Sequence, residues 1–185
     1  MSRRTTLFVL SIQSWVCCLR GRLKPASAGY MLDPMDACPV IRKARASDAA
    51  VMKRCVDAAY RHYVQRMGKL PGPMLDDYAE VVRQHMAFVA ETDGEVVGVL
   101  VLMRKDSGML LDNIAVHPVH QGRGLGRRLL DFAESESRKQ GCAWLDLYTH
   151  ETMTENIALY TARRFVETGR RTELGYDRVY MRKAL

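Results

Sequence analysis

From position 40 to the C-terminus, short apolar runs alternate with longer stretches whose apolar residues recur every three or four positions. The runs predict β-strands and the periodic stretches predict helices. The expected strands cover 40–44, 86–91, 96–103, 109–116, 143–148, 165–168 and 179–182. The expected helices cover 47–62, 76–84, 124–140 and 152–163, with irregular chain over 64–75. The order β-α-α-β-β-β-α-β-α-β-β predicts an α/β (α+β) domain with a mixed central sheet of about seven strands and about four helices.

Local signals support several of these elements. Ser47 is expected to cap the first helix. Thr152-x-x-Glu155 has the form of a capping box at the start of the last helix. The run 96–103 is apolar at all but one position, which predicts a strand covered on both faces.

Composition narrows the class of protein. A chain of 185 residues is long enough for one domain with a proper core. Its five cysteines are an odd number and lack the spacing of a zinc site, so we expect reduced thiols, a cytoplasmic protein and no metal. The net charge of +7 suits a polyanionic cofactor. The arginines are scattered, so nucleic-acid binding is not expected.

Residues 1–36 fit two interpretations. A basic pair precedes an apolar stretch, and Ala26-Ser27-Ala28 resembles a secretory cleavage site. The apolar stretch is interrupted by polar residues and is too short to span a membrane comfortably. We favour an upstream extension of the reading frame, with a natural start at Met31 or Met35. On either interpretation the folded domain is expected to cover 37–185.

The strand expected at 109–116 is followed by Gln121-x-x-Gly124-x-Gly126 and then by a helix. Backbone N–H groups at a helix start lack internal partners, the helix dipole is positive there, and glycines let an anion approach the backbone. A Walker loop is excluded because no Lys-Ser/Thr follows Gly126, and the dinucleotide fingerprint is excluded because its glycine spacing differs. Such a short motif also fits a tight turn before an ordinary helix, so the flanking sequence decides.

With its flanking sequence, the loop resembles the pyrophosphate loop of the GNAT superfamily of acetyl-CoA-dependent N-acetyltransferases. A second motif similar to the family's is Ile157-Ala158-Leu159-Tyr160, with Phe165 five residues later. The element order is also the GNAT order, and the resemblance extends from about position 40 to the end of the chain. It implies a mostly antiparallel sheet whose fourth and fifth strands splay apart, so that the pantetheine arm of acetyl-CoA lies in the gap.

The resemblance assigns the acetyl-CoA site to three parts of the chain. The backbone of Ile114, Ala115 and Val116 would bond the pantetheine like a neighbouring strand. The loop N–H groups would hold the pyrophosphate, with positive charge from two arginines. The loop residues are Gln121, Gly122, Arg123, Gly124, Leu125, Gly126 and Arg127. The family often has Asn where this chain has Met153, and Asn156 is expected to take over that contact.

The resemblance also assigns a catalytic acid. Tyr160 lies where the family places a tyrosine beside the sulfur, and a neutral phenol with a pKa near ~10 can protonate the departing CoA thiolate. By position alone, Tyr160 also fits a core aromatic. A backbone N–H near Ala115 or Val116 would stabilise the oxyanion. The family usually has Gly at the position of Arg164, where a positive φ would cost about 1 kcal/mol.

The general base is left open by the sequence. Many relatives have Glu at the position of Tyr148, which cannot act as a base at neutral pH without a perturbed pKa. Asp112 is the first choice, acting directly or through water, and Glu91, His150 and Glu151 are alternatives. Asp112 also fits a salt-bridged carboxylate at a strand end.

The resemblance places the acceptor against the first two helices and the chain between them. Tyr63, Arg66 and Met67, with Tyr148 opposite, are the expected substrate residues. Arg61 and Arg66 could bind a carboxylate, as on an amino acid, although Arg61 also fits a solvated helix surface. The sequence shows no acidic cluster that would favour a polyamine.

We therefore expect an N-acetyltransferase that moves an acetyl group from acetyl-CoA to a primary amine of a small molecule or amino acid by direct attack in a ternary complex. A covalent route through Cys55 or Cys142 is not expected, because neither has a neighbouring His. The alternatives are transfer of a longer acyl group, or a non-catalytic CoA-binding regulatory module. No nucleic-acid or membrane partner is expected, and similar enzymes commonly form homodimers.

Overall fold

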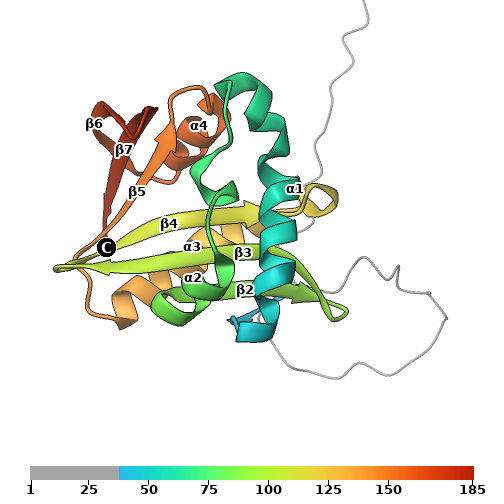
Figure 1. Cartoon of the computed structure of the whole chain (residues 1–185). Coiled ribbons are helices and arrows are strands. Elements are labelled where there is room, and N and C mark those ends of the chain that lie inside the picture. The colour runs from blue at the N-terminus through green and yellow to red at the C-terminus, as the bar shows by residue number, and fades with distance from the viewer. Residues whose placement is uncertain (1–37) are drawn as a thin grey trace, which may run out of the picture. The chain divides into compact units, whose positions relative to one another are not determined.

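Residues 38–185, the part of the chain that the computed structural model describes, form a seven-stranded sheet in the order β1-β2-β3-β4-β5-β7-β6 (Figure 1). The strands are β1 Val40–Lys43, β2 Met86–Thr92, β3 Glu95–Lys105, β4 Gly108–Val116, β5 Trp144–His150, β6 Val166–Glu173 and β7 Tyr176–Ala184. Neighbouring strands are antiparallel except β4 and β5, which are parallel. The expected mixed sheet is confirmed, and the expectations for residues 1–36 lie outside the described residues.

Helices cover both faces of this sheet. Within residues 38–185 the α-helices are α1 Ala49–Met67, α2 Tyr78–Gln84, α3 Leu125–Lys139 and α4 Thr154–Ala162. Three short 3-10 helices add η2 Ala46–Asp48, η3 Gly72–Met74 and η4 Pro118–His120. α1 and α2 lie on one face, and α3 lies on the other (Figure 1). No helix among the described residues is long and apolar enough to cross a membrane.

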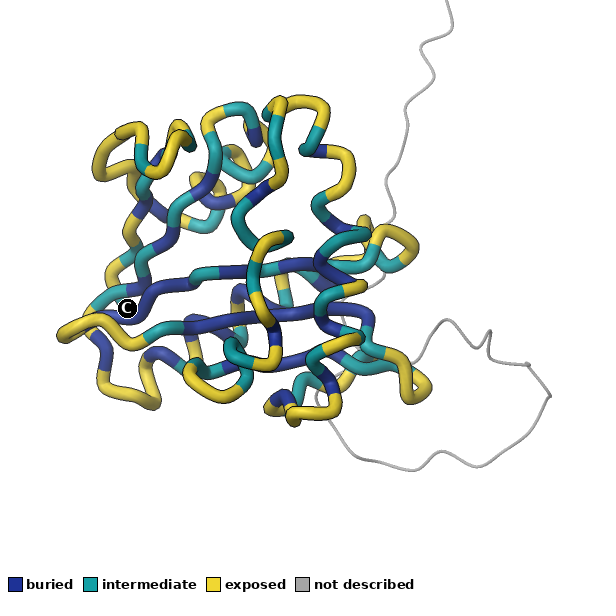
Figure 2. Tube along the Cα trace, in the orientation of Figure 1, coloured by how far each residue is buried: buried dark blue, intermediate teal, exposed yellow. Residues whose placement is uncertain are grey.

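β3 is buried on both faces, as its apolar run predicts. Leu100 and Leu102 pack with Leu129 of α3, whereas Val99 and Val101 belong to the cluster beneath α1. Figure 2 shows that buried residues concentrate in the central strands. Because alternate side chains of a strand point to opposite faces, a strand between two helical layers needs apolar residues at consecutive positions.

β4 and β5 diverge soon after they meet. Their parallel ladder holds only the pairs Met109↔Leu145, Leu110↔Asp146 and Leu111↔Leu147. Beyond these pairs β4 stays with β3 and β5 stays with β7, so the two strands separate (Figure 1). The splay expected between the fourth and fifth strands is therefore confirmed.

β6, β7 and α1 are longer than the sequence predicts. β6 and β7 form a long hairpin, whereas the apolar pattern marked only 165–168 and 179–182. β6 is exposed along almost its whole length, so it lacks the alternation that identifies a half-buried strand. α1 continues to Met67 and ends at Gly68, whose φ of 67° is a left-handed conformation that favours glycine.

Both predicted helix caps are wrong. The Asp48 carboxylate, not Ser47, accepts from the Arg45 backbone N–H at 2.7 Å ahead of α1. At the other end of the fold, α4 begins at Thr154 and no side chain caps it. Thr152 instead places its hydroxyl oxygen 2.9 Å from His150 Nδ1. Other local hydrogen bonds, between residues two or three positions apart, thus replace the predicted caps.

Arg164 adopts a φ of 66° in the turn between α4 and Phe165. This is the conformation for which glycine is expected at this position, so the arginine costs about 1 kcal/mol of backbone strain. The turn is closed by the Phe165 N–H, which donates to the Tyr160 carbonyl oxygen at 3.0 Å. The departure from glycine leaves the turn geometry intact.

The contact between Gly108 and Trp144 yields a prediction for stability. A Cβ on Gly108 would lie 2.8 Å from Cε2 of the Trp144 indole and closer still to Nε1. We expect Gly108→Ala to displace the indole and to lower the free energy of unfolding by about 1–3 kcal/mol in urea denaturation. Gly169→Ala is the matched control, because its Cβ meets no atom within 4 Å. Equal stability of the two variants would contradict this expectation.

Candidate active site

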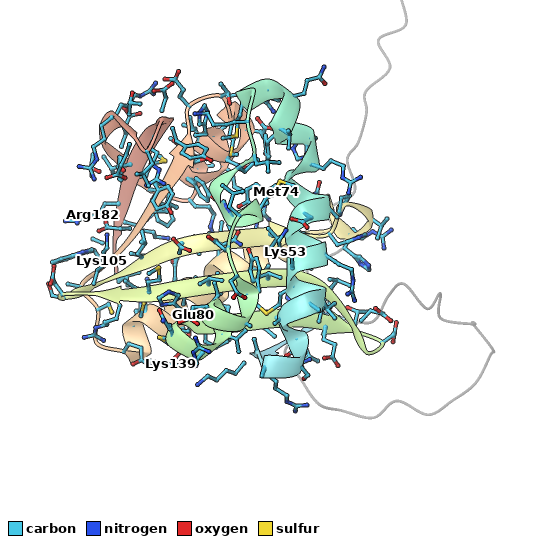
Figure 3. All side chains as sticks on the ribbon, in the orientation of Figure 1. Lys53, Met74, Glu80, Lys105, Lys139 and Arg182 are labelled. Carbon is cyan, nitrogen blue, oxygen red and sulfur yellow. The ribbon has the colours of Figure 1, made fainter. Side chains whose placement is uncertain are left out.

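A cavity of about 300 Å³ lies where β4 and β5 diverge. Its walls come from the end of α1, the chain around η3, β4, β5, α4 and the β6–β7 hairpin. The segment between α1 and α2, marked by Met74 in Figure 3, crosses over β4 and contributes Pro71 and Pro73 to the lining. The gap in the sheet is therefore enclosed by side chains from distant parts of the sequence.

Tyr160 of α4 faces this cavity. The residue is 6% exposed, and its ring packs edge-on against Phe165 with centroids 5.8 Å apart. Its hydroxyl has no hydrogen-bond partner among residues 38–185, yet the oxygen is not sealed from the cavity. Burial raises the pKa of Tyr160 most, and the nearby Tyr63 phenol raises it further. The Tyr160 phenol therefore stays protonated at neutral pH. A free hydroxyl donor thus lies in the cavity wall.

Asp112 and Tyr148 meet across the strand gap. The Tyr148 hydroxyl donates to Asp112 Oδ1 at 3.0 Å, and both residues line the cavity. Burial, followed by the charge of Asp112, raises the pKa of Tyr148, so this phenol is a donor and not a base. Asp112 forms no salt bridge with any described residue, so the interpretation as a salt-bridged strand end finds no support.

The structure separates the alternative bases. His150 lines the cavity. Glu91 instead pairs with Arg42 at 2.6 Å on the β1 side of the sheet. Glu151 is exposed and does not belong to the described lining. Of the predicted bases, Asp112 and His150 are therefore the two at the site.

Asp76 lines the same cavity, although the sequence did not single it out. It precedes α2, which begins at Tyr78, whereas the sequence placed it inside the helix. Burial raises the pKa of Asp76 most, and the charge of Asp112 raises it further. His85 and Lys53 lower it by smaller amounts. Its carboxylate has no hydrogen bond or ion pair within the described chain. Two aspartates from separate elements therefore line one cavity, which no linear signal could reveal.

The predicted substrate residues are divided by the structure. Met67 and Tyr148 line the cavity, whereas Tyr63 is buried outside the lining. Arg66 pairs with Glu155 at 2.6 Å, and this hydrogen bond lowers the pKa of Glu155 to about 2. The guanidinium is thus engaged by α4. The expectation that Arg66 binds an acceptor carboxylate finds no support in this arrangement.

The glycine loop joins η4 to α3 in an open conformation. Gly122 and Gly124 have φ values of 75° and 84°, and no atom lies within 4 Å of a Cβ at either position. From Gly122 to Arg127, no backbone N–H donates an ordinary hydrogen bond within the described chain. Gln121 Nε2 donates to the Val116 carbonyl oxygen at 2.9 Å, which ties the loop to the end of β4. Open space, free donors and a helix N-terminus together fit an anionic group.

Side chains around the loop divide into an anchor and a charged rim. Leu125 is buried in the core and fixes the first turn of α3, whereas Arg123 and Arg127 are exposed. On α4, Asn156 lines the cavity with its Nδ2 3.6 Å from Met153 Sδ. The rim can attract negative charge at the loop, and the Asn156 amide is available inside the cavity.

The end of β4 connects the loop to the cavity. Ile114, Ala115 and Val116 pair with β3 on one edge and have no strand partner on the other within residues 38–185. Ile114 reaches the cavity lining, and Ala115 is buried beneath α1. The edge of β4 without a strand partner therefore runs from the glycine loop to the cavity that Tyr160 and Asp112 line.

A buried amide holds the cavity wall together. Asn113 is 2% exposed, accepts from the Tyr60 hydroxyl at 3.0 Å and donates to the Tyr78 hydroxyl at 2.8 Å. Tyr78 in turn donates to the Pro73 carbonyl oxygen at 3.0 Å. These bonds join β4 to α1, to α2 and to the chain around η3. The network fixes the position of the segment that carries Asp76.

Comparison with known proteins matches residues 52–165 to the family model of the Acetyltransferase (GNAT) family. The solved PaiA N-acetyltransferase of Thermoplasma acidophilum in complex with coenzyme A has a TM-score of 0.68 and 17% identity, covering 80% of this chain and 99% of its own. The Escherichia coli ribosomal-protein-S18-alanine N-acetyltransferase has a TM-score of 0.62 and 21% identity. The match covers 80% of this chain and 94% of that protein. Salmonella typhimurium yncA, solved with acetyl-CoA, has a TM-score of 0.63 and 22% identity. The match covers 80% of this chain and 95% of that protein. No curated protein sequence matches significantly.

The Asn113 network generates a prediction for the cavity wall. Asn113→Ala leaves two tyrosine hydroxyls without their amide partner, so we expect the free energy of unfolding to fall by about 2–4 kcal/mol in urea denaturation. Asn156→Ala is the matched control, because this amide is only half-buried and makes weaker contacts, with Met153 Sδ at 3.6 Å and with Tyr63. The role of the network would be refuted if both variants were equally stable.

Proposed function

Because this chain belongs to the GNAT acetyltransferase family, we propose that it transfers an acetyl group from acetyl-CoA to a primary amine of a small molecule by direct attack in a ternary complex. The observation that carries this proposal is the unpaired edge of β4. It joins a loop of free backbone donors at Gly122–Arg127 to a cavity that holds the free hydroxyl of Tyr160. Family membership alone does not identify the acyl donor or the acyl acceptor. The loop and the cavity favour acetyl-CoA as the donor and a small amine as the acceptor.

The residues present fit the proposed donor. The free N–H groups of the loop would bind the pyrophosphate, with Arg123 and Arg127 adding charge at the rim. The backbone of Ile114, Ala115 and Val116 would bond the pantetheine arm along the unpaired edge of β4. Asn156 would add an amide contact inside the cavity. The bound thioester supplies the activated acetyl group.

Acid and base roles follow from the protonation states in the cavity. Tyr160 remains a neutral phenol because burial raises its pKa, so it can donate its proton to the departing sulfur. Asp112 would accept the proton of the reacting amine, directly or through water. Its hydrogen bond from Tyr148 orients the carboxylate at the cavity wall. The cavity wall therefore provides a proton donor on α4 and a proton acceptor on β4.

Direct attack is favoured over a covalent enzyme intermediate by the state of the cysteines. Burial raises the pKa of the Cys55 thiol to about 12, so little reactive thiolate is present at neutral pH. Cys142 is buried in the core that α3 covers. Neither residue belongs to the described cavity lining.

Tyr160→Phe tests the acid role. The variant keeps the buried ring but loses the hydroxyl, so we expect kcat to fall about 10²–10⁴-fold while the Kd for acetyl-CoA barely changes. Steady-state kinetics and calorimetry measure the two quantities. Tyr180→Phe is the control, because that hydroxyl donates to Glu173 outside the cavity, and its kcat should be unchanged. Parallel losses of kcat and acetyl-CoA affinity would remove the acid role.

Gly124→Val tests the loop. A branched side chain at a φ of 84° would strain the backbone and fill the space over the free N–H groups, so we expect acetyl-CoA binding to disappear in calorimetry. Gly141→Val is the matched control, because Gly141 has a φ of 69° and open surroundings at the far end of α3. It should lose similar stability and keep acetyl-CoA affinity. Unaltered binding by Gly124→Val would count against the loop assignment.

A further inference from the structure

The charges in the cavity point to a narrower class of acceptor. We propose that the acceptor is a short aliphatic diamine, whose reacting amine lies near Asp112 and whose second ammonium group is bound by Asp76. This inference rests on the proposed function, because it names the acceptor for the same cavity.

Asp76 is the first unpaired group. Its carboxylate is partly buried in the cavity wall and has neither a hydrogen bond nor an ion pair within residues 38–185. The neighbouring Lys53, labelled in Figure 3, bonds to Asp57 at 2.5 Å instead. A carboxylate withdrawn from water without a cation is costly, so a bound ammonium group would relieve an unfavourable charge.

The cations that could otherwise neutralise the cavity are engaged by other groups. Arg178 donates to Glu173 at 2.6 Å, and its guanidinium lies over the Tyr148 ring, 4.2 Å from the centroid. Arg66 pairs with Glu155 at 2.6 Å. Two aspartates thus face the cavity without a free arginine, which favours a cationic acceptor over an amino acid or another acceptor with a carboxylate.

Tyr160 provides an independent indication of a ligand. It is 6% exposed, and its hydroxyl faces the cavity without a hydrogen-bond partner in the described chain. A buried phenol normally finds a partner, so the missing partner belongs to the bound substrates. This places the reacting end of the acceptor on the Tyr160 and Asp112 side of the cavity.

Tyrosine side chains form part of the cavity wall. Tyr60 and Tyr176 join Tyr148 and Tyr160 in the lining. These side chains supply apolar surface that suits an alkyl chain. The volume of about 300 Å³ is at the small end of the range for ligand pockets, which favours a short chain.

Three four-carbon amines test the inference: putrescine, butylamine and γ-aminobutyrate. They share the reacting amine and differ at the far end, which is an ammonium, a methyl or a carboxylate group. Acetyl-CoA consumption should give a kcat/KM for putrescine about tenfold or more above that for butylamine, the effect of one charged hydrogen bond. γ-Aminobutyrate should be the poorest acceptor, because its carboxylate would face Asp76.

Asp76→Asn should remove this preference. We expect the kcat/KM for putrescine to fall about tenfold, mainly through KM, while that for butylamine is unchanged. The melting temperature should not fall, because the substitution removes an unpaired charge. Asp106→Asn is the matched control, since Asp106 is exposed in the β3–β4 turn, and its φ of 46° also suits asparagine. That variant should keep the wild-type preference.

The outcomes separate this inference from the proposed function. If butylamine or γ-aminobutyrate is acetylated as well as putrescine, the diamine assignment is wrong while the acetyltransferase proposal stands. The assignment is also wrong if the protein binds acetyl-CoA but neither acetylates putrescine nor binds it in calorimetry. Failure to bind acetyl-CoA at all would overturn the proposed function, and the acceptor assignment with it.

Discussion

The candidate site depends on the divergence of β4 from β5. β4 is bound to β3 along most of its length and β5 is bound to β7, so each strand follows a different antiparallel partner once their short shared ladder ends at Leu111 and Leu147. At the closed end of the gap, Gly108 allows the Trp144 indole to pack against the start of β4. The gap therefore opens only toward the carboxyl ends of the two strands. Ligands of open α/β sheets bind at this edge, because it is where neighbouring connections separate.

The divergence concentrates unpaired polar groups in one region. In a completed core, backbone donors and carboxylates are paired, because an unpaired buried group costs free energy. Here the loop N–H groups, the Tyr160 hydroxyl and the Asp76 carboxylate lack partners among the described residues. Within residues 38–185, the fully buried side-chain polar atoms without a partner are Thr92 Oγ1 and Arg163 Nε, and neither residue lines the cavity. The network around Asn113 offsets this cost locally, since it holds the wall in place with fully paired groups. Local departures from polar pairing of this kind are expected at functional sites.

The features that the sequence predicted are those encoded within one element or one turn. The apolar run of β3 required helices on both faces, and α1 and α3 supply them. The spacing of Gly124 and Gly126 marked a helix start with free donors, because the backbone conformation there depends on the residues of the loop itself. Tyr160 followed from a motif within α4. Periodicity failed for β6, whose exposed residues carry no alternation.

The proposed acceptor site was not evident from the sequence, because it forms only through tertiary contacts. An arginine such as Arg66 can bind a carboxylate, but this guanidinium already pairs with Glu155 of α4. Asp76 lies after η3, and it lines the same cavity as Asp112 only because this part of the chain crosses β4. The glycine loop is built from local backbone, so it can stay unchanged while other parts of the fold vary. The cavity walls come from several elements. Substitution of a single wall residue can then alter the preferred amine without disturbing the glycine loop, since the loop is anchored separately by Leu125 in the core and by Gln121 on β4.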